Sequence, residues 1–392
     1  MPKVIVGMSG GVDSSVAAYL LREKGYEVEG LSFILWEKRR KADFKTCCSL
    51  QAVEEAAKTA QHIGIPHLIA DVKDDFVEKV IEPFVNAYTE GSTPNPCILC
   101  NRFMKFPLLI KEAVKRNAEF IATGHYARVE QKEEANGGEG GFESFTRHSL
   151  LKKGVDPKKD QSYVLYILNQ EQLKKLVLPL GYYRKDEVRD IAKDLKLPAA
   201  KRAESQEVCF VEDRNYFKFI EKLSPLAGKP GPIIDMTGEV IGTHKGIHAY
   251  TIGQRKRLGI AQKKPLYVVK IDALKNAVYV GSQETAKKRE FYVEDLNWIN
   301  PPITPFLKED KEGLSFNASV KVRSMMKDEP ATIFLVTSNK LRVTSRVKNT
   351  YEPPKTVRLV FDEPQWAPAS GQSAVFYNDD VVIGGGVIRI PV

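Results

Sequence analysis

The chain has 392 residues, which suggests two to three domains at about 100–200 residues each. Hydrophobic residues make up 43% and charged residues 28%, a mixture typical of a globular protein with a substantial core. The net charge of +9 favours a polyanionic partner such as a nucleic acid. No apolar stretch approaches the roughly 20 residues that span a bilayer, and five cysteines do not form a disulfide scaffold. We expect a cytoplasmic monomer without membrane contact.

The first half of the sequence alternates strand and helix patterns. Hydrophobic runs predict strands at Lys3–Met8, Tyr26–Trp36, His67–Val72 and Glu119–Thr123. Helical spacing predicts helices at Val12–Lys24, Ser49–Ile63, Asp74–Tyr88 and Asn101–Arg116, and short ones at Gln161–Leu168, Glu171–Leu176 and Arg184–Leu195. This alternation predicts an α/β doubly wound parallel sheet with helices on both faces.

After about residue 210, turn residues separate short alternating runs. The runs that predict strands are Leu266–Ile271, Ala277–Val280, Ala318–Arg323, Thr332–Val336, Leu341–Ser345, Thr356–Phe361 and Ser373–Tyr377. Short strands at this spacing indicate a small β-barrel. We therefore predict a catalytic domain over residues 1–210, a mixed or β linker domain over 211–283 and a C-terminal β-barrel over 284–392.

The first strand runs directly into a turn rich in glycine and serine, GMSGGVDSS over residues 7–15, which a helix follows. Glycines let backbone N–H groups approach an anion closely, and a helix N-terminus adds partial positive charge. The segment has neither the lysine of a Walker A loop nor the spacing of a dinucleotide fingerprint. An ordinary turn needs no serine cluster, so the pattern predicts a phosphate-binding site.

Three cysteines stand out. Cys97 and Cys100 form a CxxC after a proline-rich turn, and Cys209 lies near the end of the α/β region, whereas Cys47 and Cys48 are interpreted as structural. Two alternatives stay open. Cys100 and Cys209 can work as a sulfur-transferring pair through a persulfide, or Cys97, Cys100 and Cys209 can ligate zinc or an iron–sulfur cluster. A third interpretation, as buried small residues, does not explain the proline-rich CxxC.

Seven segments carry a resemblance to a known family. In chain order they are SGGVDS, TPNPCILCN, ATGHYAR, KDQSYVL, ESQEVCF, HAYTIGQRKRLGI and GQSAVFY. The first resembles the pyrophosphate loop (PP-loop) of the N-type ATP pyrophosphatases, which share the adenine-nucleotide α-hydrolase fold and cleave ATP to AMP and pyrophosphate. Together, in this order and over nearly the whole length, the segments resemble those of the tRNA-specific 2-thiouridylases.

The resemblance implies ATP-dependent 2-thiolation of the wobble uridine, U34, in tRNAs for Lys, Glu and Gln. The reaction would pass through an adenylated uridine and a cysteine persulfide, and would release AMP and pyrophosphate. ATP and Mg²⁺ would be needed, with Asp13 positioning the metal, and a cysteine desulfurase or a sulfur-relay protein would supply sulfur. Cys100 would be the nucleophile and Cys209 the persulfide carrier.

The resemblance also implies binding residues. The ATP contacts would be Gly7, Met8, Ser9, Gly10, Gly11, Val12, Asp13, Ser14, Phe33 and Gly124. The tRNA contacts would be Asn95, Pro96, Cys97, His125, Lys159, Asp160, Gln161, Arg323, Ser324 and Gln372. Many relatives have Asp where this chain has Cys97, a departure that favours the cluster alternative. Two rival functions share parts of the pattern: another PP-loop ligase or amidotransferase, and an RNA-binding protein without catalysis.

Overall fold

The computed structural model describes residues 1–36, 50–136, 144–201, 208–211, 215–260, 264–301, 308–310, 313–336 and 354–391. Cys47, Cys48 and the predicted strand Leu341–Ser345 lie outside these ranges. The chain forms two compact units. The first comprises Met1–Glu82, Pro96–Tyr216 and Asp380–Val382, and the second comprises Pro83–Asn95, Phe217–Asp379 and Ile383–Val392. The boundaries of the three predicted domains stay predictions.

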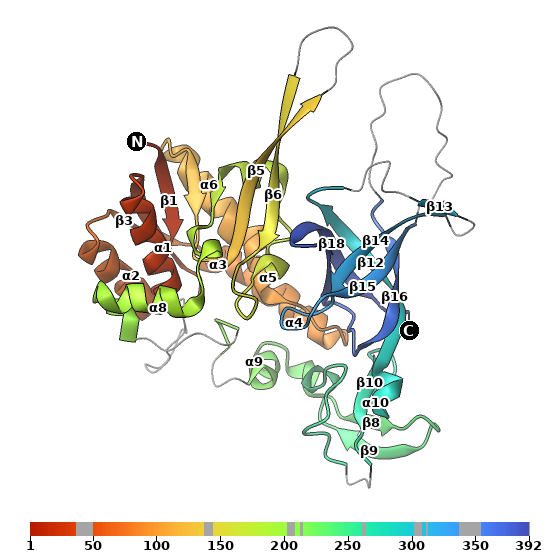
Figure 1. Cartoon of the computed structure of the whole chain (residues 1–392). Coiled ribbons are helices and arrows are strands. Elements are labelled where there is room, and N and C mark those ends of the chain that lie inside the picture. Colours follow the sequence, from red (N-terminus) through yellow and green to blue (C-terminus); the bar gives the residue numbers. More distant parts are fainter. Residues whose placement is uncertain are drawn as a thin grey trace. The chain divides into compact units, whose positions relative to one another are not determined.

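A parallel sheet forms the centre of the first unit (Figure 1). Its described strands are β1 (Lys3–Gly7), β2 (Glu27–Ile34), β3 (His67–Asp71), β4 (Phe120–Ala122) and β7 (Leu176–Val177), in the spatial order β3-β2-β1-β4-β7. Every neighbouring pair is parallel, which confirms the predicted doubly wound sheet. The chain proceeds from β1 to one side and from β4 to the other, so the strand order reverses between β1 and β4. Ligands bind at the carboxyl ends of strands at such a switch point.

Helices cover both faces of this sheet. Val4 and Val6 pack in one cluster with apolar residues of α1 (Val12–Glu23), α2 (Leu50–His62) and α8 (Lys185–Asp194), helices that Figure 1 shows together. Side chains alternate between the two faces of a strand. Gly7 accordingly faces the other side, where Leu109 of α6 (Phe106–Lys115) lies 3.4 Å from the position that a Cβ would take.

The predicted helix Asn101–Arg116 is wrong at its start. The helical run begins at Pro96 and continues through α5 (Pro96–Cys100), the π-helical η2 (Asn101–Lys105) and α6. Proline suits a first helical position because no N–H is needed there. Asn101 resembles a capping residue in sequence, but its buried side chain donates from Nδ2 to the Val164 carbonyl at 3.0 Å. Cys97 therefore lies in the first turn of the helix, and Cys100 lies at the start of the second turn.

The sequence analysis missed an antiparallel hairpin, β5 (Ala127–Asn136) and β6 (Ser144–Lys153), because its strands are largely polar. The predicted helix Gln161–Leu168 is also wrong, since only a 3₁₀ turn, η3 (Ser162–Val164), forms there. The remaining elements of this unit are α3 (Lys73–Phe76), η1 (Val77–Ile81), α7 (Gln170–Lys175), η4 (Pro179–Tyr182) and η5 (Pro198–Lys201). Helix α4 (Glu82–Thr89) continues from η1 into the second unit.

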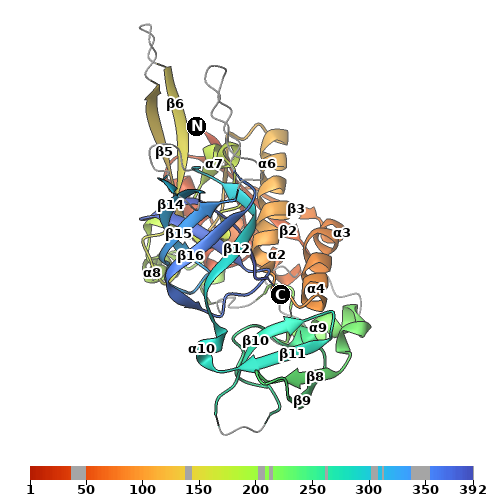
Figure 2. The same cartoon turned by 90° about the vertical axis from the view of Figure 1, so that its right-hand side faces the viewer.

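The second unit contains two described sheets. One has the order β10-β11-β8-β9 and comprises β8 (Gly231–Ile234), β9 (Val240–His244), β10 (Tyr267–Asp272) and β11 (Ala277–Gly281). The other follows the order β12-β16-β15-β14-β17-β18 and closes where β12 pairs with β18, which confirms the predicted barrel. Figure 2 shows β12, β14, β15 and β16 side by side.

The barrel strands are β12 (Lys287–Trp298), β14 (Gly313–Lys321), β15 (Glu329–Leu335), β16 (Val357–Trp366), β17 (Ser373–Asn378) and β18 (Val381–Arg389), and β13 (Lys308–Asp310) pairs with β14. The helices are α9 (Tyr216–Leu223), η7 (Pro225–Gly228), η8 (Ile247–Ala249) and α10 (Gln283–Ala286). Phe291, Phe316, Phe361 and Phe376 fill the barrel interior. Within the described ranges, no helix combines the length and the apolar character needed to cross a membrane.

Candidate active site

The glycine- and serine-rich turn between β1 and α1 is organised by its own side chains. Ser9 N–H donates to Ser14 Oγ at 3.1 Å, and the hydroxyls of Ser14 and Ser15 donate to the Gly11 carbonyl at 3.1 and 2.9 Å. Gly10 has a φ of +71°, a conformation that favours glycine. The serines therefore shape the loop, which explains why they occur in a cluster.

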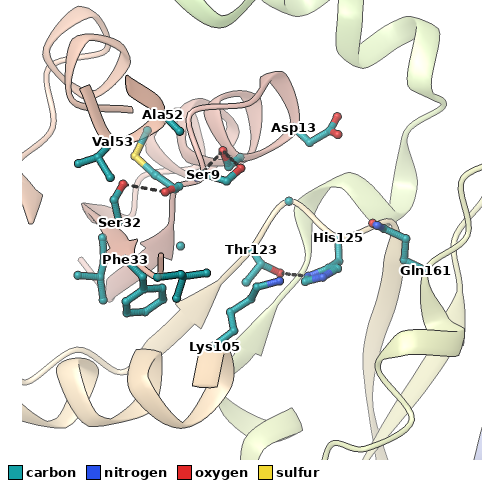
Figure 3. A pocket seen from close by; sticks show the side chains of 16 residues that line it. Ser9, Asp13, Ser32, Phe33, Ala52, Val53, Lys105, Thr123, His125 and Gln161 are labelled. Atoms are coloured by element: carbon teal, nitrogen blue, oxygen red, sulfur yellow. Dashed lines mark hydrogen bonds between the residues drawn. The ribbon is translucent and has the colours of Figure 1, made fainter. Parts of the chain in front are cut away.

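A pocket of about 230 Å³ lies where β1 and β4 end, at the switch point (Figure 3). Of the predicted ATP contacts, seven line it: Gly7, Met8, Ser9, Asp13, Ser14, Phe33 and Gly124. The further lining residues are Leu31, Ser32, Leu35, Ala52, Val53, Lys105, Thr123, His125 and Gln161. Gly10, Gly11 and Val12 are not in this lining. The apolar side chains suit a purine base, and the adjoining loop suits phosphates.

Gly124 follows β4 and presses against the loop. A Cβ at this position would lie 2.7 Å from the carbonyl carbon of Asp13 and 2.8 Å from the backbone nitrogen of Ser14. Both neighbours are backbone atoms, so no flexible side chain can move aside. Glycine is therefore required here for the close approach of two chain segments that lie more than a hundred residues apart in sequence.

Asp13 is held by two side chains to which the sequence analysis assigned no role at the phosphate loop. Its Oδ1 accepts a hydrogen bond from the Tyr126 hydroxyl at 2.7 Å and from Lys185 Nζ at 2.6 Å. The side chain of Lys185 is only 7% exposed, whereas that of Asp13 is 37% exposed. The ATGHYAR segment was a sequence signal for Tyr126. The only such signal for Lys185 was its position at the start of a predicted helix.

His125 lines the pocket as a buried, neutral ring. Burial lowers its pKa well below the usual 6.5, and the charge of Lys105 lowers it further. Its Nδ1 lies 2.7 Å from the Thr123 hydroxyl, a pair that Figure 3 shows at the pocket, and its ring stacks on Phe106. The predicted contact of His125 with tRNA stays a prediction.

The loop of residues 154–162 fixes Tyr126 and Lys185. Gln161 accepts from the Tyr126 N–H at 2.9 Å with its side chain, and its own N–H donates to the Tyr126 carbonyl at 2.8 Å. Asp156 Oδ2 accepts from the Lys185 N–H at 3.0 Å. Asp160 accepts from the N–H groups of Gly154 and Ser162 and from the Ser162 hydroxyl. Asp160 and Gln161 thus hold the loop together, and their contact with tRNA, like that of Lys159, stays a prediction.

In the second unit, two predicted tRNA contacts bind protein backbone. Arg323 Nη2 donates to the carbonyls of Ile252 and Ala367 at 3.1 and 2.6 Å. The Gln372 amide donates to the Thr93 carbonyl at 2.9 Å, and Thr93 N–H donates to the Ser370 carbonyl at 2.8 Å.

Ser324 is half-buried. Asn95, at the end of the Pro83–Asn95 segment of the second unit, is also half-buried. The predicted contacts of Ser324 and Asn95 with tRNA stay predictions.

The described cysteines all belong to the first unit. Cys97 is exposed, and Cys100 and Cys209 are half-buried thiols. Phe210, next to Cys209, packs edge-on against Phe76 with 5.6 Å between ring centroids. Phe76 leads directly into η1, which packs against α5, the helix that carries Cys100. The segments that carry Cys100 and Cys209 therefore both pack against the same helical segment, Phe76–Ile81.

Metal donors are not gathered in the described part of the chain. No group of three or more His, Cys, Asp or Glu side chains is arranged to hold an ion there, so Cys97, Cys100 and Cys209 do not form a preformed cluster site. Mg²⁺ has different needs, because one or two carboxylates and the phosphates of a nucleotide hold it together with water. Asp13, which belongs to the phosphate loop, fits that requirement.

Sequence comparisons cover almost the entire chain. Family models match a tRNA methyl transferase HUP domain at residues 2–213, a tRNA methyl transferase PRC-barrel domain at 218–282 and an aminomethyltransferase β-barrel domain at 344–388.

Two curated relatives are similar over nearly their full length. The tRNA-specific 2-thiouridylase MnmA 2 of Thermoanaerobacter sp. (strain X514) is 44% identical over 99% of this chain and 98% of its own. The tRNA-specific 2-thiouridylase MnmA of Clostridioides difficile (strain 630) is 42% identical over the same shares. With its PP-loop pocket and this similarity from end to end, the chain belongs to the family of tRNA-specific 2-thiouridylases.

Proposed function

We propose that this protein catalyses the ATP-dependent 2-thiolation of the wobble uridine, U34, of tRNAs for Lys, Glu and Gln. The observation that carries the proposal is the pocket between the Gly7–Ser14 loop and Gly124, in a chain that aligns with named 2-thiouridylases over 99% of its length. The net charge of +9 is consistent with a tRNA substrate. An amidotransferase-type ligase would not need this charge or the pair Cys100 and Cys209.

The first step activates the uridine. With ATP in the pocket and its phosphates on the Gly7–Ser14 loop, the uridine O2 attacks the α-phosphorus, and pyrophosphate leaves. The loop N–H groups and the N-terminus of α1 stabilise the negative charge that develops on the leaving group. Asp13 would hold Mg²⁺, which supplies further neutralisation of that charge when bound. The product is an adenylated uridine, whose C2 now carries a good leaving group.

The second step supplies sulfur. Cys209 carries a persulfide that a cysteine desulfurase or a sulfur-relay protein delivers. The Cys100 thiolate attacks the inner sulfur of Cys209, which forms a Cys100–Cys209 disulfide and releases hydrosulfide. Hydrosulfide attacks C2, and AMP leaves with the original oxygen. In a variant of this route the persulfide attacks C2 itself and Cys100 then resolves the mixed disulfide. Either way an external dithiol must reduce the disulfide before the next turnover.

The remaining predicted contacts belong to this proposal. Residues expected to touch tRNA are Asn95, Pro96, Cys97, His125, Lys159, Asp160, Gln161, Arg323, Ser324 and Gln372. We propose that the protein acts as a cytoplasmic monomer.

Helix α5 and Phe210 both pack against the Phe76–Ile81 segment, and this arrangement favours a meeting of the Cys100 and Cys209 thiols.

Mass analysis of the wobble nucleoside tests the function. Purified protein is incubated with unmodified tRNA, ATP, Mg²⁺ and a persulfide donor. We expect 2-thiouridine from the wild type and none from Cys100→Ser or Cys209→Ser, while both variants still bind tRNA. Cys97→Ser separates the two sulfur routes, because the relay does not use this thiol whereas a three-cysteine cluster requires it. Thiolation in either of the first two variants would refute the relay, and a loss of thiolation with Cys97→Ser, together with bound iron, would favour the cluster route.

A further inference from the structure

The carboxylate of Asp13 is used asymmetrically. Its Oδ1 accepts both hydrogen bonds, from Tyr126 at 2.7 Å and from Lys185 at 2.6 Å. Within the described residues, Oδ2 has no protein partner. Asp13 also lines the pocket and precedes Ser14 in the phosphate loop. One oxygen is therefore anchored to the protein, and the other remains available to a ligand.

The two anchoring side chains are themselves rigidly placed. Lys185 is the first residue of α8, where its N–H donates to Asp156 and its side chain is 7% exposed. Its Nζ lies 5.6 Å from the centroid of the Tyr126 ring, which adds a cation–π contact between the two anchors. The Tyr126 backbone is held on both its N–H and its carbonyl by Gln161. Burial of an ammonium group costs desolvation free energy unless the charge is paired, and the Lys185 ammonium is paired with the Asp13 carboxylate.

We propose that Lys185 and Tyr126 form a positioning pair, which fixes Oδ1 of Asp13 and so directs Oδ2 to the divalent cation that accompanies ATP. The inference rests on the proposed function, because it takes ATP as the ligand of the pocket. Lys185 acts through Asp13 and not through the phosphates. Without either anchor the carboxylate can rotate about its side-chain torsions, and the cation loses a preoriented ligand.

Calorimetry with α,β-methylene-ATP, which is not cleaved between its α- and β-phosphates, separates the positioning of Asp13 from catalysis. Binding is measured with and without Mg²⁺. We expect Lys185→Met to weaken Mg²⁺-dependent binding about tenfold, the size expected for a lost charge-assisted hydrogen bond, and to change Mg²⁺-free binding little. Lys193→Met is the matched control, since Lys193 lies on the same helix, is 68% exposed and forms an ion pair with Asp190 one turn away, which is also exposed. It should bind as the wild type does.

Tyr126→Phe keeps the ring and removes only the hydroxyl, so it tests the same inference if Lys185→Met does not fold. Its Mg²⁺-dependent binding should also weaken. In the double variant the two losses should combine to less than their product, because both act on the same oxygen. Equal losses of analogue affinity with and without Mg²⁺ would indicate that Lys185 contacts the phosphates, and would overturn the inference. Unchanged affinity in both Lys185→Met and Tyr126→Phe would also overturn it. A wild type that does not bind the analogue would instead refute the ATP step of the proposed function, and the inference with it.

Discussion

Replacement of Gly124 by alanine tests whether the close approach of β4 to the phosphate loop builds the ATP site. The added Cβ would lie 2.7 Å from Asp13 carbonyl carbon, 2.8 Å from Ser14 nitrogen and 2.9 Å from Asp13 carbonyl oxygen. Optimal contacts between carbon atoms lie at about 3.5–4.0 Å, so the loop must move by about 1 Å. Such overpacking typically costs about 1–3 kcal/mol of stability. A misplacement of about 1 Å at a reacting centre can cost about 100-fold in rate.

Pyrophosphate release with saturating tRNA measures the rate effect, and a thermal melt measures stability. We expect Gly124→Ala to stay folded at ordinary temperature, to melt earlier and to release pyrophosphate about 100-fold more slowly. Gly228→Ala is the matched control, because a Cβ there would meet no atom closer than 4.0 Å. If Gly124→Ala released pyrophosphate within about twofold of the wild-type rate, the glycine would not be needed for loop placement and the reasoning would be refuted.

Two further predictions concern stability. Burial lowers the pKa of His125, so below about pH 6.5 the unfolded chain takes up a proton that the folded chain does not. The contribution of neutral His125 to the free energy of unfolding should therefore be complete above that pH and should fall below it, by up to about 1.4 kcal/mol per pH unit. Urea denaturation at several pH values should show a shallower pH dependence of this free energy in His125→Gln. The same pH dependence in the wild type and the variant would contradict the prediction. Arg323→Met removes the donor to the carbonyls of Ile252 and Ala367 and should cost about 1.5–3 kcal/mol by urea denaturation. The matched Arg389→Met, which removes an exposed ion pair, should cost less than about 1 kcal/mol. Equal losses in the two variants would contradict a stabilising role for the two hydrogen bonds of Arg323.

Local sequence patterns predicted the parts of the fold whose signals are local. The alternation of apolar runs with helical spacing predicted the parallel sheet, and short strands predicted the barrel, both of which the structure confirms. The patterns failed where tertiary contacts override them. Asn101 looks like a helix cap, but its side chain is buried against the Val164 carbonyl, and the helix begins five residues earlier at Pro96. The polar strands β5 and β6 lack the apolar alternation by which a strand is recognised.

The sequence by itself determined the phosphate loop, since glycines and serines next to one another in the chain build it through hydrogen bonds among residues 9 to 15. Only the tertiary structure decided which side chains surround it. Lys185 reaches Asp13 across 172 residues, and Tyr126 across 113. No periodicity or spacing encodes such contacts, because they arise when the carboxyl ends of β1 and β4 meet at the switch point of the sheet and α8 packs beside α1.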